Sequence, residues 1–119
     1  WPEPSLLPSS PFAVAKVQEL SQFIELYFEL VARRLIRNLL AGTEPDPVVL
    51  KEVRTSLDKA VTALPRLSSF EQFAYGDQFT LADIAAILNL PIVRNVGKAF
   101  LGKDPLAEVP GLDAYCARM

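Results

Sequence analysis

Few residues in this chain of 119 could carry chemistry by themselves. The chain contains no histidine, the residue that most often serves as a general base or a metal ligand. Its one cysteine, Cys116, has no histidine to activate it as a thiolate, so we expect an inert, partly buried side chain. No cluster of carboxylates or thiols has the spacing of a metal site. The residues therefore predict no catalytic group, no metal and no cofactor held by this chain.

A glycine-containing segment, Gly97 to Lys103, matches the G-x-x-x-x-G-K part of a phosphate-binding loop. The next residue should be Ser or Thr, which would hold magnesium, but it is Asp104, whose carboxylate would repel phosphate. The segment also lacks a preceding strand. We interpret it as a loop with exposed lysines and not as a nucleotide site.

Two further candidates lie in the longest apolar segment. Arg33 follows Glu29 by four residues, an order that favours an ion pair on a helix, although Arg33 or Arg34 could instead meet an anion in a cleft. The two arginines cannot share a face, because consecutive helical positions are about 100° apart. Tyr27 lies on the apolar stripe of this segment, which favours a core or interface position over a hydroxyl aimed at a substrate.

Composition excludes several classes of function. The chain has 12 Lys and Arg against 14 Asp and Glu, a net charge of −2, so bulk charge does not favour nucleic acid or an anionic membrane surface. No apolar run approaches the ~18 residues of a membrane span, and Trp1 to Pro4 do not resemble a signal peptide. One cysteine cannot form an internal disulfide. Ten prolines with five glycines favour helices separated by proline stops.

The prolines divide the chain into predicted helices. The first runs from Phe12 to about Leu40, capped by Ser9 or Ser10 and ended by Gly42. Its apolar stripe comprises Leu20, Phe23, Ile24, Tyr27, Phe28, Val31 and Leu35. Other apolar residues lie off the stripe, so we expect this helix to be covered on more than one side. A second helix begins at Asp46 and Pro47 and is limited by Pro65.

The strongest local signal follows the turn at Gly76. Thr80 and Asp83 have the spacing of a capping box, and Phe79 and Ile84 occupy the positions of a hydrophobic staple. Either Thr80→Ala or Asp83→Ala should then cost about 1 kcal/mol through the lost cap.

The rest of the chain completes an all-helical interpretation. The capped helix should run to Leu90, where Pro91 must kink or end it, and Gly97 to Asp104 should form a loop with a short helix. A last short helix from Pro110 to Met119 should pack through Leu112, Tyr115 and Met119. No segment alternates with the period of a strand. The sequence predicts an all-α bundle of about five helices.

These residues resemble a known family. The segment Gly76 to Ile84 is similar to the G-D-x-[FL]-[ST]-x-A-D-[IV] segment that opens the central helix in the C-terminal helical domain of glutathione transferases. Residues 1–11 resemble the linker that precedes this domain, and residues 12–119 resemble the domain itself. Val109 to Tyr115 is similar to its terminal helix.

The resemblance implies a C-terminal domain without the N-terminal thioredoxin-like domain. In the full-length protein, a cytoplasmic homodimer, the thiolate of glutathione as co-substrate would attack a small apolar electrophile. This chain would supply a hydrophobic wall of the electrophile pocket and dimer contacts, and it would be inactive alone. By position on the first helix, Tyr27, Val31 and Arg34 are the candidate substrate-binding residues.

Two other functions stay open at this point. Helical domains of this kind also serve as non-catalytic protein–protein interaction domains in translation complexes and bacterial stress regulators. A third interpretation is the ligand domain of a transcription regulator, although the chain has no basic DNA-binding segment. An activating Tyr, Ser or Cys in the preceding domain would favour the enzyme.

Overall fold

The computed structural model describes residues 6–119, and these residues form helices and connecting segments without a strand. The elements are α1 (Pro11–Ile24), the π turn η1 (Glu25–Glu29), α2 (Leu30–Ala41), α3 (Pro47–Ala63), the 3₁₀ turn η2 (Leu64–Arg66), α4 (Leu81–Val96), the π turn η3 (Gly97–Leu101) and α5 (Leu112–Arg118). The all-α prediction is confirmed. The expected number of about five is close, because α1, η1 and α2 join into one long helix, which leaves four separate helices in residues 6–119.

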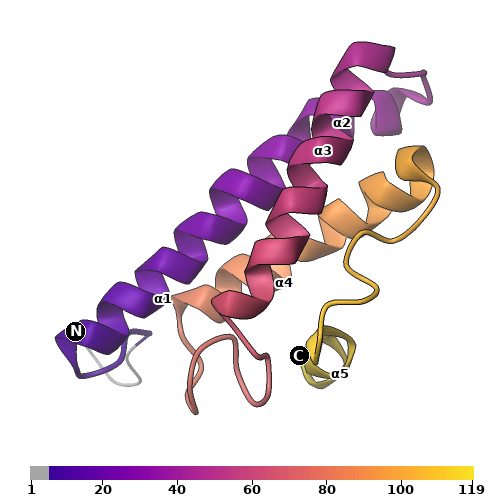
Figure 1. The fold of residues 1–119 in the computed structure, drawn as a ribbon. Coiled ribbons are helices and arrows are strands. Elements are labelled where there is room, and N and C mark those ends of the chain that lie inside the picture. The colour runs from indigo at the N-terminus through magenta and orange to yellow at the C-terminus, as the bar shows by residue number, and fades with distance from the viewer. Residues whose placement is uncertain (1–5) are drawn as a thin grey trace.

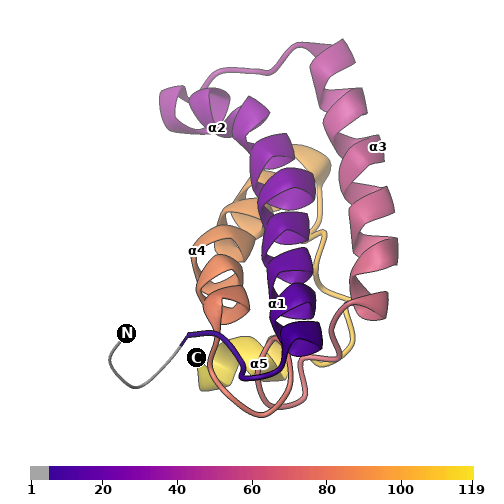
Figure 2. The same cartoon turned by 90° about the vertical axis from the view of Figure 1, so that its left-hand side faces the viewer.

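The long helix packs between two others. Figure 2 shows α1 flanked by α4 on one side and α3 on the other, with α5 closing the same end of the bundle at which the described chain begins. In Figure 1 the long helix and α3 run alongside each other, and α4 lies behind them. The core between these helices is made of fully buried apolar side chains, among them Leu20, Phe28, Leu57, Leu90 and Val93.

The helix ends follow the local chemistry of the sequence. Ser10 Oγ accepts a hydrogen bond of 3.0 Å from the N–H of Ala13 at the start of α1. Asp46 caps α3 by accepting one of 2.8 Å from the N–H of Val48, and Pro47 follows as the first helical residue. Gly42 ends α2 in the left-handed conformation, at φ +68°, where a residue without a Cβ is favoured. These three predictions are confirmed.

The π turn η1 changes which side of the long helix is buried. The buried residues are Val17, Leu20, Ile24, Phe28, Ala32 and Leu35. The steps of four from Leu20 to Ala32 include the additional residue per turn that a π segment introduces. Tyr27 therefore leaves the buried stripe on which the sequence placed it and is 55% exposed, while Val31 is only partly buried. A core position is therefore wrong for Tyr27, because the predicted stripe assumed a regular α-helical period, whereas Val31 still packs against the core.

The central helix α4 does not end at its proline. It passes through Pro91 to Val96 and continues as η3 to Leu101. Of the two predicted effects of Pro91, a kink or an end, the end at Leu90 is wrong. The short helix expected between Gly97 and Asp104 is present as η3. Pro91 is exposed, and water can therefore bind the carbonyl of Ile87 that loses its hydrogen-bond donor. Leu90 and Val93 on the opposite side are buried and hold the helix in the core.

The segment that precedes α1 is held against α4. The carbonyl of Leu6 accepts a hydrogen bond of 3.0 Å from the N–H of Leu81, the first residue of that helix, and Leu7 packs on the core. Leu6 therefore lies beside the first turn of the central helix, and residues 7–10 connect it to α1. The expectation for Trp1 and the first part of the predicted linker lies outside the described residues.

By length and composition alone, Leu81–Leu101 could cross a membrane, with 21 residues and a mean hydropathy of 1.3. The core helix of a soluble bundle meets the same criteria. In this structure the buried face of that helix contributes Ala86, Leu90 and Val93 to the core. Packing within the bundle accounts for part of the apolar composition, since 39% of the apolar window is buried.

Candidate functional site

The three substrate-binding candidates follow one line along the long helix. Tyr27 lies in η1, and the centroid of its ring is 5.1 Å from that of Phe23. Val31 and Arg34 follow in α2. The Nη2 atom of Arg34 lies 2.8 Å from Oε2 of Glu52 on α3 and forms an ion pair with it. Tyr27 is thus open to a ligand, while the guanidinium of Arg34 is turned toward the neighbouring helix. The partner Glu52 could not be predicted from the sequence, because it lies 18 residues away on another helix.

A shallow hollow of about 480 Å³ adjoins Tyr27. It is lined by Ala15, Gln18, Glu19, Gln22, Phe23, Leu26 and Tyr27. Of the three candidates only Tyr27 lines this hollow, with its ring next to Phe23 and Leu26. An apolar molecule could contact the two aromatic rings there, while Gln18 and Gln22 offer amide groups at its edge.

The predicted ion pair on the long helix is confirmed. Arg33 donates from Nη2 to both carboxylate oxygens of Glu29, at 2.7 and 2.9 Å, and from Nε to one of them at 2.9 Å. This bidentate geometry occupies the guanidinium. The alternative in which Arg33 meets an external anion would require it to leave Glu29.

The capping box at the start of α4 is formed as predicted. Thr80 Oγ1 accepts a hydrogen bond of 3.2 Å from the N–H of Ala82, and both halves of the box are present. Asp83 Oδ2 accepts one of 2.9 Å from the N–H of Thr80. Phe79, whose ring centroid lies 6.5 Å from that of Phe73, and the partly buried Ile84 flank the box, and their staple contact stays a prediction.

Asp83 does more than cap the helix. Its side chain is fully buried, and Oδ1 accepts hydrogen bonds of 2.8 Å from the N–H of Ala74 and 2.7 Å from the hydroxyl of Tyr115. One carboxylate thus joins the loop before α4, the first turn of α4 and the last helix. Burial, and then the hydrogen bond to Asp83, raise the pKa of Tyr115 well above its ordinary value, so the phenol stays a neutral donor.

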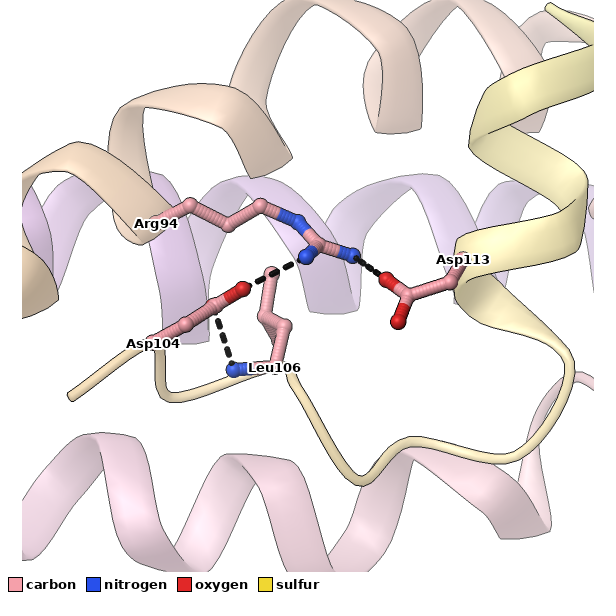
Figure 3. Close-up of polar contacts among 4 residues, drawn as sticks. All are labelled: Arg94, Asp104, Leu106 and Asp113. Carbon is pink, nitrogen blue, oxygen red and sulfur yellow. Dashed lines mark hydrogen bonds and ion pairs between the residues drawn. The ribbon is translucent and has the colours of Figure 1, made fainter.

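A second polar cluster fixes the chain after α4. Arg94 forms ion pairs with Asp104 at 2.5 Å and with Asp113 at 2.8 Å, as Figure 3 shows. The other oxygen of Asp104 accepts a hydrogen bond of 2.9 Å from the N–H of Leu106. Burial alone would lower the pKa of Arg94, but the hydrogen bond to Asp113 and the charge of Asp104 raise it. Arg94 therefore stays charged and holds the 104–106 turn and α5 against the central helix.

Removing the guanidinium of Arg94 should destabilise the fold measurably. Arg94→Met keeps much of the side-chain volume but leaves the mostly buried Asp104 without its cation, and we expect a loss of about 2 kcal/mol in the free energy of unfolding. Urea denaturation measures this. The matched control is Arg34→Met, which breaks a pair with Glu52 in which both side chains are exposed and should cost less than about 1 kcal/mol. Equal losses in the two variants would contradict the structural role of Arg94.

Three predictions about the end of the chain need correction. Cys116 is exposed on α5, whereas we expected it to be partly buried, because the buried side of this short helix is taken by Leu112 and Tyr115. Met119 lies beyond the last residue of α5 and is exposed, so it does not pack. Only Gly97–Leu101 of the predicted loop continues α4, as the π turn η3, and Gly102 and Lys103 lie beyond its end. Within residues 6–119 no three metal-ligating side chains converge.

The geometry defines an all-α domain whose central helix is capped and anchored from within by one buried carboxylate. The family model for the C-terminal domain of glutathione S-transferase matches residues 22–118, and the chain belongs to this family. A glutathione S-transferase from Pseudomonas putida (strain F1) is 37% identical over 115 residues, which cover 97% of this chain and 52% of the relative. The chain thus spans about half the length of the curated relative that it matches.

Proposed function

We propose that residues 12–119 are the C-terminal domain of a longer glutathione transferase and form one wall of its electrophile pocket. A preceding thioredoxin-like domain binds glutathione as co-substrate, and residues 1–11 link it to the helical domain. The thiolate sulfur of glutathione attacks the electrophilic carbon of a small apolar substrate, forms a thioether bond and displaces the leaving group. The family match and the half-length coverage of the P. putida enzyme support this proposal.

The observation that carries the proposal is the apolar surface that the long helix leaves exposed. Tyr27, Leu26 and Leu30 are each more than two-fifths exposed, although they are large apolar residues in the middle of the long helix. Exposed aromatic and aliphatic groups beside a hollow suit an apolar ligand, which gains free energy when it leaves water. In this proposal Tyr27 and Val31 contact the electrophile, and Arg34 lies at the edge with its partner Glu52.

The partners follow from the same proposal. Leu6, the first described residue, lies beside the first turn of α4, a helix on which the apolar residues Leu81, Ile87 and Leu88 are exposed. A preceding domain would therefore enter next to this helix. The full-length protein is proposed to be a cytoplasmic homodimer. Neither nucleic acid nor a membrane is among its proposed partners, in keeping with a net charge of −2.

The proposal predicts a selective effect of Tyr27→Ala in the full-length protein. With glutathione and an aryl chloride as substrates, steady-state kinetics should show a KM for the aryl chloride raised about tenfold, because one aromatic contact is lost. The KM for glutathione should not change, since the proposed glutathione site lies on the other domain. Val48→Ala, at a 65% exposed position on α3, is the matched control and should leave both constants unchanged.

Three results would contradict the proposed function. If the Tyr27→Ala enzyme had unaltered kinetics for a series of apolar electrophiles, Tyr27 would not contact the electrophile. Conjugation by the 119-residue chain alone would show that the catalytic group lies within it. If the full-length protein conjugates no electrophile and its preceding domain lacks an activating Tyr, Ser or Cys, the function is instead that of a non-catalytic interaction domain.

A further inference from the structure

The hollow beside Tyr27 has an aromatic side and a polar side. Phe23 and Tyr27 follow one line along the long helix, and their ring centroids lie 5.1 Å apart. Gln18 and Gln22 follow a neighbouring line and offer uncharged amide groups. Among the described residues that line the hollow, the carboxylate of Glu19 carries the only charge. A ligand in the hollow therefore meets aromatic rings, amides and one negative group.

The charges next to the hollow are also mostly negative. Glu25 follows Gln22 by three residues, is exposed, and takes part in no ion pair within residues 6–119. The nearby cation is Lys16, whose Nζ lies 3.5 Å from Oε1 of Glu19 and 5.6 Å from the ring centroid of Phe12. Its ammonium group is thus held toward Phe12, which precedes the hollow, and it offsets one of the two carboxylates.

The basic half of the long helix supplies no free cation at the hollow. Arg33 is held by both carboxylate oxygens of Glu29, and Arg34 is paired with Glu52. Arg37 follows Tyr27 by ten residues, about 15 Å along the helix, which is longer than the Debye length of about 8 Å at physiological salt. An anionic group in the hollow would therefore meet carboxylates without a compensating charge.

We propose that the hollow selects aromatic electrophiles by charge. It favours a ring with a positively charged substituent, accepts a neutral one and disfavours a negatively charged one. The faces of Phe23 and Tyr27 attract a cation, and the carboxylates of Glu19 and Glu25 add to this attraction and repel an anion. This inference rests on the proposed function and names the substrate class of the same site, with Glu19 as its specificity-determining residue.

Isothermal titration calorimetry of the full-length protein tests the order of affinities. Three ligands share a nitrobenzene ring and have no leaving group, so they bind without reacting: 3-nitrobenzylammonium, 3-nitrobenzamide and 3-nitrobenzoate. At low ionic strength the ammonium ligand should bind about tenfold more tightly than the amide, and the benzoate about tenfold more weakly. In about 0.5 M salt, the ratio between the two charged ligands should fall at least about fivefold.

Three variants locate the selectivity on the long helix. Glu19→Gln should lower the ratio of the ammonium and benzoate affinities about fivefold, because it removes the negative charge that lines the hollow. Lys16→Gln should raise this ratio about threefold, because Glu19 loses its cation. Glu44→Gln makes the same change as Glu19→Gln at an exposed position beyond the end of α2, and this control should leave the ratio unchanged. Circular dichroism checks that each variant folds.

Two kinds of result would overturn the inference. One is equal affinity for the three ligands, or a ratio that is the same in the Glu19→Gln variant. The other is a Tyr27→Ala variant that binds all three ligands as well as the original protein, since the ligands would then bind outside the hollow.

The outcomes separate this inference from the proposed function, because binding of these ligands does not depend on catalysis. If the expected order is found in a protein that conjugates no electrophile, the charge preference of the hollow stands and the proposed function falls. If conjugation of an aryl chloride depends on Tyr27 while the three ligands bind equally, the proposed function stands and the charge preference falls.

Discussion

Replacing Asp83 by alanine is expected to lower the free energy of unfolding by about 4 kcal/mol. The carboxylate accepts hydrogen bonds from the N–H groups of Ala74 and Thr80 and from the hydroxyl of Tyr115, and all of these lie in the buried part of the domain. Alanine would leave three buried donors without an acceptor, and each such donor costs about 1–3 kcal/mol. The capping box alone predicted a loss of only about 1 kcal/mol.

The same measurement on two other variants separates the parts of this network. In urea denaturation, Thr80→Ala should cost about 1 kcal/mol, since it removes the cap but leaves Asp83 with its other donors. Tyr115→Phe should cost about 1–2 kcal/mol, because it removes one hydrogen bond to a charged acceptor. If Asp83→Ala were no more destabilising than Thr80→Ala, the bonds to Ala74 and Tyr115 would contribute nothing, and the network would be refuted.

Gly97→Ala should destabilise the domain by about 3 kcal/mol, although helix propensity alone predicts a gain of about 1 kcal/mol. Gly97 lies in a helical conformation at the start of η3, where alanine is normally preferred. A Cβ at this position would lie 2.1 Å from Cδ of the Pro105 ring and 2.8 Å from the carbonyl oxygen of Lys103. Neither neighbour is the flexible end of a side chain, so the 103–105 segment would have to move.

Helix propensity alone predicts that Gly97→Ala raises the stability, whereas overlap of the new Cβ with Pro105 and Lys103 predicts that it lowers the stability. The sign of the measured change therefore decides between the two. Thermal unfolding monitored by circular dichroism should show a lower Tm for Gly97→Ala. Gly102→Ala is the control, since its Cβ would meet no atom within 4 Å and the cost there comes from φ +78° alone, about 1 kcal/mol. A Tm that rises in Gly97→Ala would mean that Pro105 does not pack against this turn.

The parts of the fold that the sequence predicted depend on local interactions. Ser10, Asp46 and Thr80 bond to N–H groups only two or three residues away, and Gly42 supplies a conformation that needs no tertiary partner. Their effects can therefore be inferred from spacing. The passage of α4 through Pro91 depends instead on which side of the helix the core covers.

The parts that the sequence did not predict depend on distant residues. Asp83 and Tyr115 are 32 positions apart, and no spacing rule connects them. No spacing rule connects Arg94 with Asp113 either, because the two are brought close by the turn after α4. The exposure of Tyr27 was missed because a π turn has no reliable sequence signature. The sequence placed Leu20, Ile24, Phe28 and Leu35 on the buried side of the long helix correctly, but it did not predict the exposure of Tyr27.

The hydrogen bond between the carbonyl of Leu6 and the N–H of Leu81 gives the leading segment a mechanical role. A force applied to the chain before residue 6 acts on the hydrogen bond to the first turn of α4 before it acts on α1. A protease that cuts between residues 7 and 10 would release this acceptor, and the amide of Leu81 would then exchange its hydrogen with solvent more rapidly. The hydrogen-exchange rate at Leu81 would thus report the integrity of a segment 75 residues away.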